Sequence, residues 1–91
     1  INYLILPEKN GAIRKGYYLI TNVYSDKVTA EKKMAELRRL GLKKSGFFTT
    51  PSGEWNYVFL ERYDNLEDAK KANSSNYNNK YKDIIWMLPI L

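Results

Sequence analysis

The order of strand-like and helix-like patterns is the feature that most constrains the fold of this chain. Residues 16–24 (GYYLITNVY) are mostly β-branched or aromatic, which is typical of a strand. Apolar side chains then recur at helical spacing between residues 27 and 40. Two short strand-like segments follow at 44–49 and 54–62, separated by a Thr-Pro-Ser-Gly turn, and this arrangement predicts a hairpin.

The remainder of the chain predicts one more helix and one more strand. Asp64 and Asn65 are candidate N-caps for a helix that should fray through residues 73–79. The apolar segment 83–88 predicts a final strand that ends at Pro89. The resulting β-α-β-β-α-β order packs two helices onto one face of a four-stranded antiparallel sheet, the ferredoxin-like α+β arrangement, and leaves the other face open.

A chain of 91 residues is expected to hold one domain, which we place at 16–91. Residues 1–15 are interpreted as an N-terminal extension or linker, and a further strand within residues 1–7 (INYLILP) stays open. The chain begins with Ile, without a Met or a signal segment, so it is interpreted as a fragment of a longer protein. No apolar run reaches the roughly 18 residues that a membrane-spanning helix needs.

The composition disfavours an enzyme. The chain contains neither Cys nor His, so it lacks the usual nucleophile, the usual base near neutral pH and the preferred zinc ligands. Its ten acidic residues are scattered, and we predict no catalytic residues, no metal and no cofactor. The net charge of +5 permits an anionic partner, but the basic residues cluster on the predicted helices and are interpreted as a solvated helix face.

Strand alternation predicts an exposed aromatic platform on the open face. In the 54–62 strand it assigns Trp55, Tyr57 and Phe59 to the open face and Val58 and Leu60 to the helix face. A flat aromatic surface of this kind stacks well on sugar rings or nucleobases.

The same alternation divides the first strand. It assigns Leu19, Thr21 and Val23 to the helix side and Tyr18, Ile20 and Asn22 to the platform. For Trp86 and Phe59, packing in the core and exposure on the platform both stay open.

Several segments together resemble the SPOR (sporulation-related repeat) domains of bacterial envelope proteins. The similarity covers about residues 16–89, and it rests on the order and spacing of its parts more than on any one of them. The segments that carry it are 17–25 (YYLITNVYS), Ala30-Glu31 with Leu37 and Gly41-Leu42, Trp55-Asn56-Tyr57-Val58 with Tyr63, and Glu67-Asp68-Ala69. The chain departs from the family pattern at Ile20, where Gln is common, at Asn22, where Gly is usual, and at Tyr57, where Arg is frequent.

The resemblance implies a peptidoglycan-binding module that recognises glycan strands lacking stem peptides. It implies a periplasmic or envelope location, as a domain of a larger exported or membrane-anchored protein that acts in processes such as cell division. The glycan-binding residues would be Tyr18, Ile20, Asn22, Trp55, Tyr57 and Phe59.

Two other functions stay open. The sheet could contact other envelope proteins after loss of glycan binding. An RNA-recognition motif has the same element order, but Glu54 stands beside the platform, Leu19 occupies an aromatic position of that motif, and most basic residues lie on the helices. Nucleic acid is therefore the least favoured partner.

Overall fold

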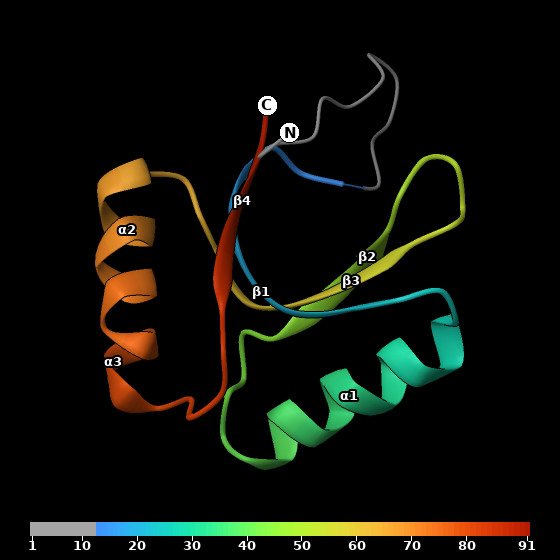
Figure 1. Cartoon of the computed structure of the whole chain (residues 1–91), viewed down its shortest axis with the longest axis horizontal. Helices are drawn as coiled ribbons and strands as arrows, with labels where there is room; N and C mark the ends of the chain where they lie inside the picture. Colours follow the sequence, from blue (N-terminus) through green and yellow to red (C-terminus); the bar gives the residue numbers. More distant parts are fainter. Residues whose placement is uncertain (1–12) are drawn as a thin grey trace.

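The computed structural model describes residues 13–91, which form a four-stranded antiparallel sheet with its helices on one face (Figure 1). The strands lie in the order β2-β3-β1-β4, so the predicted β-α-β-β-α-β, ferredoxin-like arrangement is confirmed. Residues 1–12, including the strand considered at 1–7, lie outside the described part. The elements are β1 (Gly16–Tyr24), α1 (Lys27–Arg39), β2 (Gly46–Thr49), β3 (Asn56–Tyr63), α2 (Leu66–Ser74), α3 (Asn76–Asn79) and β4 (Trp86–Ile90).

Side-chain caps explain where the two longer helices begin. The Asp26 carboxylate accepts a hydrogen bond from the Thr29 backbone N–H at 2.9 Å, at the start of α1. The Asn65 side chain accepts from the N–H groups of Glu67 and Asp68 at the start of α2. Each cap satisfies backbone donors that the first helical turn leaves without partners, which is why both helices start where the sequence predicts.

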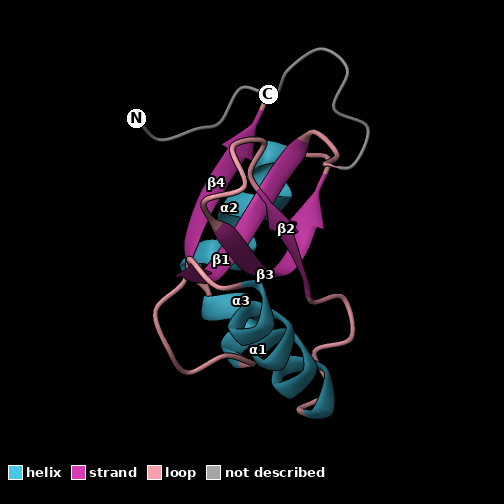
Figure 2. Cartoon of the chain, turned by 90° about the vertical axis from the view of Figure 1, so that its right-hand side faces the viewer, coloured by secondary structure: helices cyan, strands magenta, loops and turns pink. Residues whose placement is uncertain are grey.

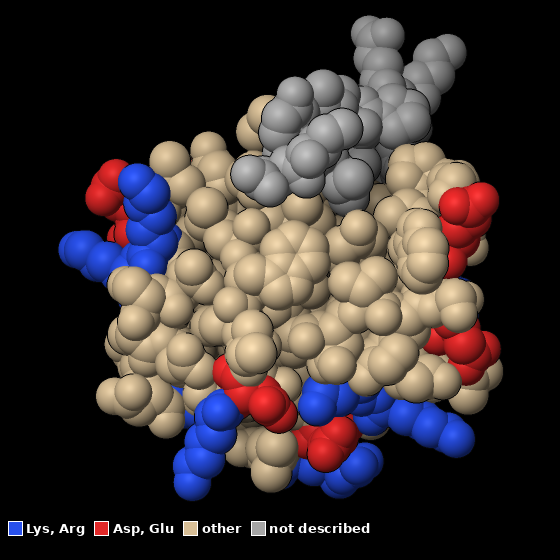
Figure 3. Space-filling view, in the orientation of Figure 1, with Lys and Arg blue, Asp and Glu red and all other residues tan. Residues whose placement is uncertain are grey.

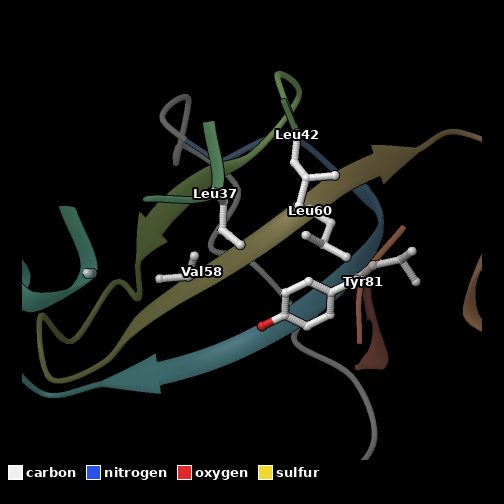
Figure 4. Packing of buried hydrophobic residues seen from close by; sticks show 7 residues of the cluster. Leu37, Leu42, Val58, Leu60 and Tyr81 are labelled. Atoms are coloured by element: carbon white, nitrogen blue, oxygen red, sulfur yellow. The ribbon is translucent and has the colours of Figure 1, made fainter. Parts of the chain in front are cut away.

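The main hydrophobic core lies between the sheet and the helices. Leu37 of α1 points toward Val58 and Leu60 of β3 in Figure 4, and all three side chains are fully buried. This arrangement confirms that Val58 and Leu60 face the helices, as strand alternation predicts. The buried members of this core are Leu19, Ala30, Leu37, Leu42, Val58, Leu60 and Tyr81.

A second buried cluster lies on the sheet face opposite the helices, the face turned toward the viewer in Figure 2. Tyr18 and Ile20, which the sequence predicts to be part of an open platform, are buried members of this cluster. The central strand β1 contributes to both clusters, because Leu19 points to the helices and Ile20 to the opposite face, each with no exposed surface. The buried members of the second cluster are Ile13, Tyr18, Ile20, Phe48, Leu88 and Ile90.

A β-bulge changes the faces of β1 after Ile20. Ile20 lies opposite Phe59, whereas Asn22 lies opposite Val58, so two steps along β1 match one step along β3. Directly opposed residues of antiparallel strands share a face, and Val58 packs in the helix-side core. Asn22 therefore points toward the helices, and the prediction that it lies on the open face is wrong.

The bulge also reverses Val23, which alternation assigns to the helix side. Val23 lies opposite Tyr57 and is exposed on the open face. Asn22 has a buried side-chain oxygen without a hydrogen-bond partner among the described residues. The register shift thus replaces a predicted polar group on the open face with an apolar one.

Pro89 lies inside β4, where the sequence predicts the end of the last strand. The strand starts at Trp86 and continues to Ile90, with Pro89 opposite Tyr17 of β1. Because β4 is an edge strand, a proline without an N–H can stand in it without breaking a ladder on both sides. The predicted bounds of 83–88 are therefore wrong by three residues at the start and two at the end.

The predicted fraying after α2 takes the form of a left-handed turn, α3. All four residues from Asn76 to Asn79 have positive φ, between 52° and 61°. Three of the four are Asn, which tolerates this region better than most residues. The Asn76 side-chain amide fixes the turn by donating to the backbone oxygens of Tyr81 and Asp83, both at 2.9 Å.

Gly46 of β2 is predicted to be intolerant of any side chain because the Phe59 ring lies across it. A Cβ atom at Gly46 would stand 2.7 Å from Cζ of Phe59, closer than such contacts allow. Gly46→Ala should lower the free energy of unfolding by about 1–3 kcal/mol, as overpacking of a core does. Urea unfolding followed by circular dichroism measures this loss.

A double variant separates this clash from a general effect on the strand. Phe59→Leu removes the ring, so the cost of Gly46→Ala should be smaller in the Phe59→Leu background than in the native chain. Strictly additive losses would show that the Phe59 ring is not the cause.

Candidate functional site

Five aromatic rings form a continuous series across the face of the sheet opposite the helices. We call Tyr18, Phe48, Phe59, Tyr57 and Trp86 the aromatic track. The ring centroids of Tyr18 and Phe59 lie 4.9 Å apart, and Phe48 stacks on Tyr57 at 5.2 Å with only 6° between the planes. Tyr57 then contacts Trp86 in an edge-on arrangement at 6.2 Å. These separations are typical of favourable aromatic pairs, so the rings hold one another in place.

Exposure increases along the aromatic track. Tyr18 is only 4% exposed and Phe48 is also buried, whereas Tyr57 is half-buried and Trp86 is 40% exposed. Trp86 stands on the edge strand β4, opposite Ile20 of β1. The most exposed end of the track is therefore the one formed by Tyr57 and Trp86.

The structure separates the residues that the sequence predicts as one platform. Tyr57 and Phe59 do lie on the open face and are half-buried. Tyr18 and Ile20 lie on the same face but are buried beneath their neighbours, so the prediction that they are exposed is wrong. Asn22 points to the helices, as described above.

Trp55 lies just before β3, and among the described aromatic contacts it makes none with the track. Its indole is 47% exposed. Its backbone oxygen accepts from the N–H of Thr50 at 2.9 Å and closes the turn between β2 and β3. The structure therefore supports exposure of Trp55, as predicted, but gives it no aromatic neighbour that would extend a stacking surface.

Trp86, like Phe59, is a residue for which the sequence analysis leaves both core packing and exposure open. Its face could be deduced from the alternation of Trp86, Leu88 and Ile90 once β4 is known to pair with β1. Leu88 lies opposite Tyr18, so it lies on the open face with Tyr18. Trp86 is two residues before Leu88 in the same strand and therefore lies on the same face. The sequence alone could not assign a face to Trp86 because no local pattern shows which strand β4 pairs with.

A pocket of about 500 Å³ opens at the other end of the aromatic track. Its lining includes the track residues Tyr18, Phe48 and Phe59, which provide an aromatic surface. Its charged lining residues are Arg14, Lys44, Glu61 and Arg62, and we call this hollow the basic pocket.

Hydrogen bonds fix Glu61 at the border of the basic pocket. Its carboxylate accepts from the hydroxyl of Tyr77 at 2.7 Å and from that of Tyr63 at 3.3 Å, and Lys44 Nζ lies 3.3 Å away. Burial is the main reason that the pKa values of Tyr63 and Tyr77 lie well above their ordinary value, and the negative charge of Glu61 raises them further. Both hydroxyls thus remain donors to Glu61 far into alkaline solution.

Charged side chains surround an uncharged centre on the surface shown in Figure 3, and many Lys and Arg residues gather along the edge where α1 lies.

Within residues 13–91, no group of three or more metal-ligating His, Cys, Asp or Glu side chains occurs. None of the helices in this range is long and apolar enough to cross a membrane.

The two tyrosines at Glu61 predict a loss of stability in alkaline solution. Their raised pKa values mean that the folded chain keeps protons that the unfolded chain loses above about pH 10, so the free energy of unfolding should fall as the pH rises past that value. Tyr77→Phe should make this fall less steep, measured by urea unfolding between about pH 9 and pH 11.

Tyr57→Phe is the matched control because Tyr57 lies on the open face of the sheet and is not a partner of Glu61. It should leave the slope unchanged. Equal slopes for the native chain and Tyr77→Phe would contradict the assignment of Tyr77 as a proton-retaining group.

Comparisons of the chain with protein-family models, with curated proteins and with solved structures found no match. The geometry of the open face, together with the residues that carry the SPOR resemblance, is therefore the basis for a functional proposal.

Proposed function

We propose that this domain is a non-catalytic module of a bacterial envelope protein that binds peptidoglycan glycan strands lacking stem peptides. The observation that carries the proposal is the pair formed by Tyr57 and Trp86, which project from neighbouring regions of the open face and contact each other edge-on at 6.2 Å. Aromatic rings at a protein surface pack well against the apolar faces of sugar rings, and their polar atoms hydrogen-bond at the rim.

The fold supports this proposal because it separates the helices from the proposed binding face. Both longer helices pack on the side of Leu19 and Val58, so a long polymer can lie across the opposite side without meeting them. The proposed setting is the periplasm or cell envelope, within a larger exported or membrane-anchored protein. The support for that setting is the SPOR resemblance.

The polar contacts to the glycan differ from those that the sequence suggests. The Tyr18 hydroxyl donates to the backbone oxygen of Arg14 at 2.6 Å, and Asn22 faces the helices, so neither is offered to a ligand on the open face. The Tyr57 hydroxyl and the Trp86 indole N–H are the polar groups of the exposed end. They would replace the Gln, Gly and Arg positions from which this chain departs.

A protein-interaction domain of an envelope assembly is the second candidate. The observation that favours it is that Val23 and Trp86, on the open face, and Ile84, just before β4, are all exposed apolar side chains. In this alternative Trp86 would be a contact for another protein, and no glycan would be retained.

Replacement of Trp86 tests the proposal directly. Trp86→Ala should weaken binding to amidase-treated glycan strands roughly ten-fold, because one stacking side chain contributes on the order of 1 kcal/mol or more. Co-sedimentation of the 91-residue chain with these strands measures the loss, with intact peptidoglycan and a short RNA in parallel. Retention on the stripped strands alone is the expected pattern.

Ile84→Ala is the matched control, since Ile84 is 82% exposed and stands two residues before Trp86. It should bind as the native chain does, and both variants should keep the native melting temperature within a few degrees. No retention of the native chain on either glycan would overturn the proposal, and retention on RNA would move the function to nucleic acid.

A further inference from the structure

The basic pocket contains positively charged side chains, whereas the aromatic track contains none. Three cationic side chains, those of Arg14, Lys44 and Arg62, line it against the single carboxylate of Glu61. Two of the cations have partners: Lys44 pairs with Glu61 at 3.3 Å and Arg62 with Asp64 at 2.5 Å. Within residues 13–91, Arg14 forms no ion pair. The pocket lining therefore keeps an excess of positive charge.

Hydrogen bonds hold two of the residues that line the pocket, Arg62 and Tyr18, in place. Arg62 donates from Nε to the backbone oxygen of Lys15 at 2.7 Å, which fixes the guanidinium beside the chain segment that leads into β1. The Tyr18 hydroxyl donates to the backbone oxygen of Arg14 at 2.6 Å. Burial raises the pKa of Tyr18 while the positive charges of Arg62 and Arg14 oppose that rise, which reflects the positive potential at this spot.

The pocket is continuous with the aromatic track. Tyr18, Phe48 and Phe59 belong to both, and Phe48 stacks directly on Tyr57. A ligand that spans both regions would need a flat, partly apolar body for the rings and an anionic group for the cations. A carboxylate-bearing sugar in a longer strand has both properties.

We propose that the basic pocket is a carboxylate subsite that reads the acidic sugars of the bound glycan. This inference rests on the proposed function. In peptidoglycan the lactyl group of muramic acid is bound as an amide to the stem peptide, and hydrolysis of that amide leaves a free carboxylate on the sugar. Arg14 and Lys44 attract that carboxylate through charge, so the pocket favours strands from which the peptide has been removed.

Chemical reduction of the lactyl carboxylates to alcohols provides the test, because it removes the charge and keeps the strand. The native chain should bind stripped strands at least five-fold more tightly than reduced strands at low salt, and the difference should shrink as salt rises. The double variant Arg14→Gln/Lys44→Gln should bind both strands equally, with an affinity close to that of the native chain for reduced strands.

The matched control is Lys70→Gln/Lys71→Gln, which removes the same charge from α2 on the helix side of the sheet. It should keep the preference for stripped strands. Equal binding of native chain to stripped and reduced strands, or an unchanged preference in Arg14→Gln/Lys44→Gln, would overturn the carboxylate subsite and leave the aromatic contact standing. Failure to bind either strand would overturn the proposed function itself, and the subsite with it.

Discussion

The burial of β1 on both faces is the constraint on which the rest of this structure depends. Leu19 and Ile20 are neighbours in the chain, point to opposite faces and are both fully buried. One face is covered by helices, as the element order requires, but the other needs cover of its own. Ile13, Phe48 and side chains from β4 supply part of it. The surface left for a ligand is thus what remains after the central strand has been covered.

Local signals explain why the element order and several bounds are predictable. The β1 strand spans Gly16–Tyr24 as predicted, because aromatic and β-branched residues make up most of it. Asn65 caps α2 because its short side chain reaches the first free N–H groups. The bulge between Ile20 and Asn22 is different, since it arises from the pairing of β1 with β3 across 30 or more residues of chain. One extra residue there reverses the faces of Asn22 and Val23, which alternation alone cannot anticipate.

The candidate site shows the same division between local and long-range information. Alternation correctly places Tyr57 and Phe59 on one face because both belong to one regular strand. It cannot tell an exposed ring from a covered one, because cover comes from other strands: Phe48 of β2 lies against Tyr18, and Leu88 of β4 pairs with it. Trp86 gains its place beside Tyr57 in the same way, through pairing at the sheet edge.

The proposed glycan ligand is consistent with the small exposed area of the aromatic track, because a repetitive ligand tolerates a weak single contact better than a small molecule does. Tyr57 and Trp86 are only partly exposed, so a ligand that covers them buries little surface. The gain from that burial exceeds the entropy lost on binding by only a small amount, and a single contact therefore gives modest affinity. In our proposal the glycan strand repeats the same disaccharide, so a module that leaves one unit finds an equivalent unit in the next repeat. Several modules in one assembly would gain further from their shared attachment. In our proposal, the basic pocket at the buried end of the track would add selectivity for strands with free lactyl carboxylates. Stacking on sugar rings cannot supply this selectivity, because stripped strands and reduced strands present the same apolar sugar faces.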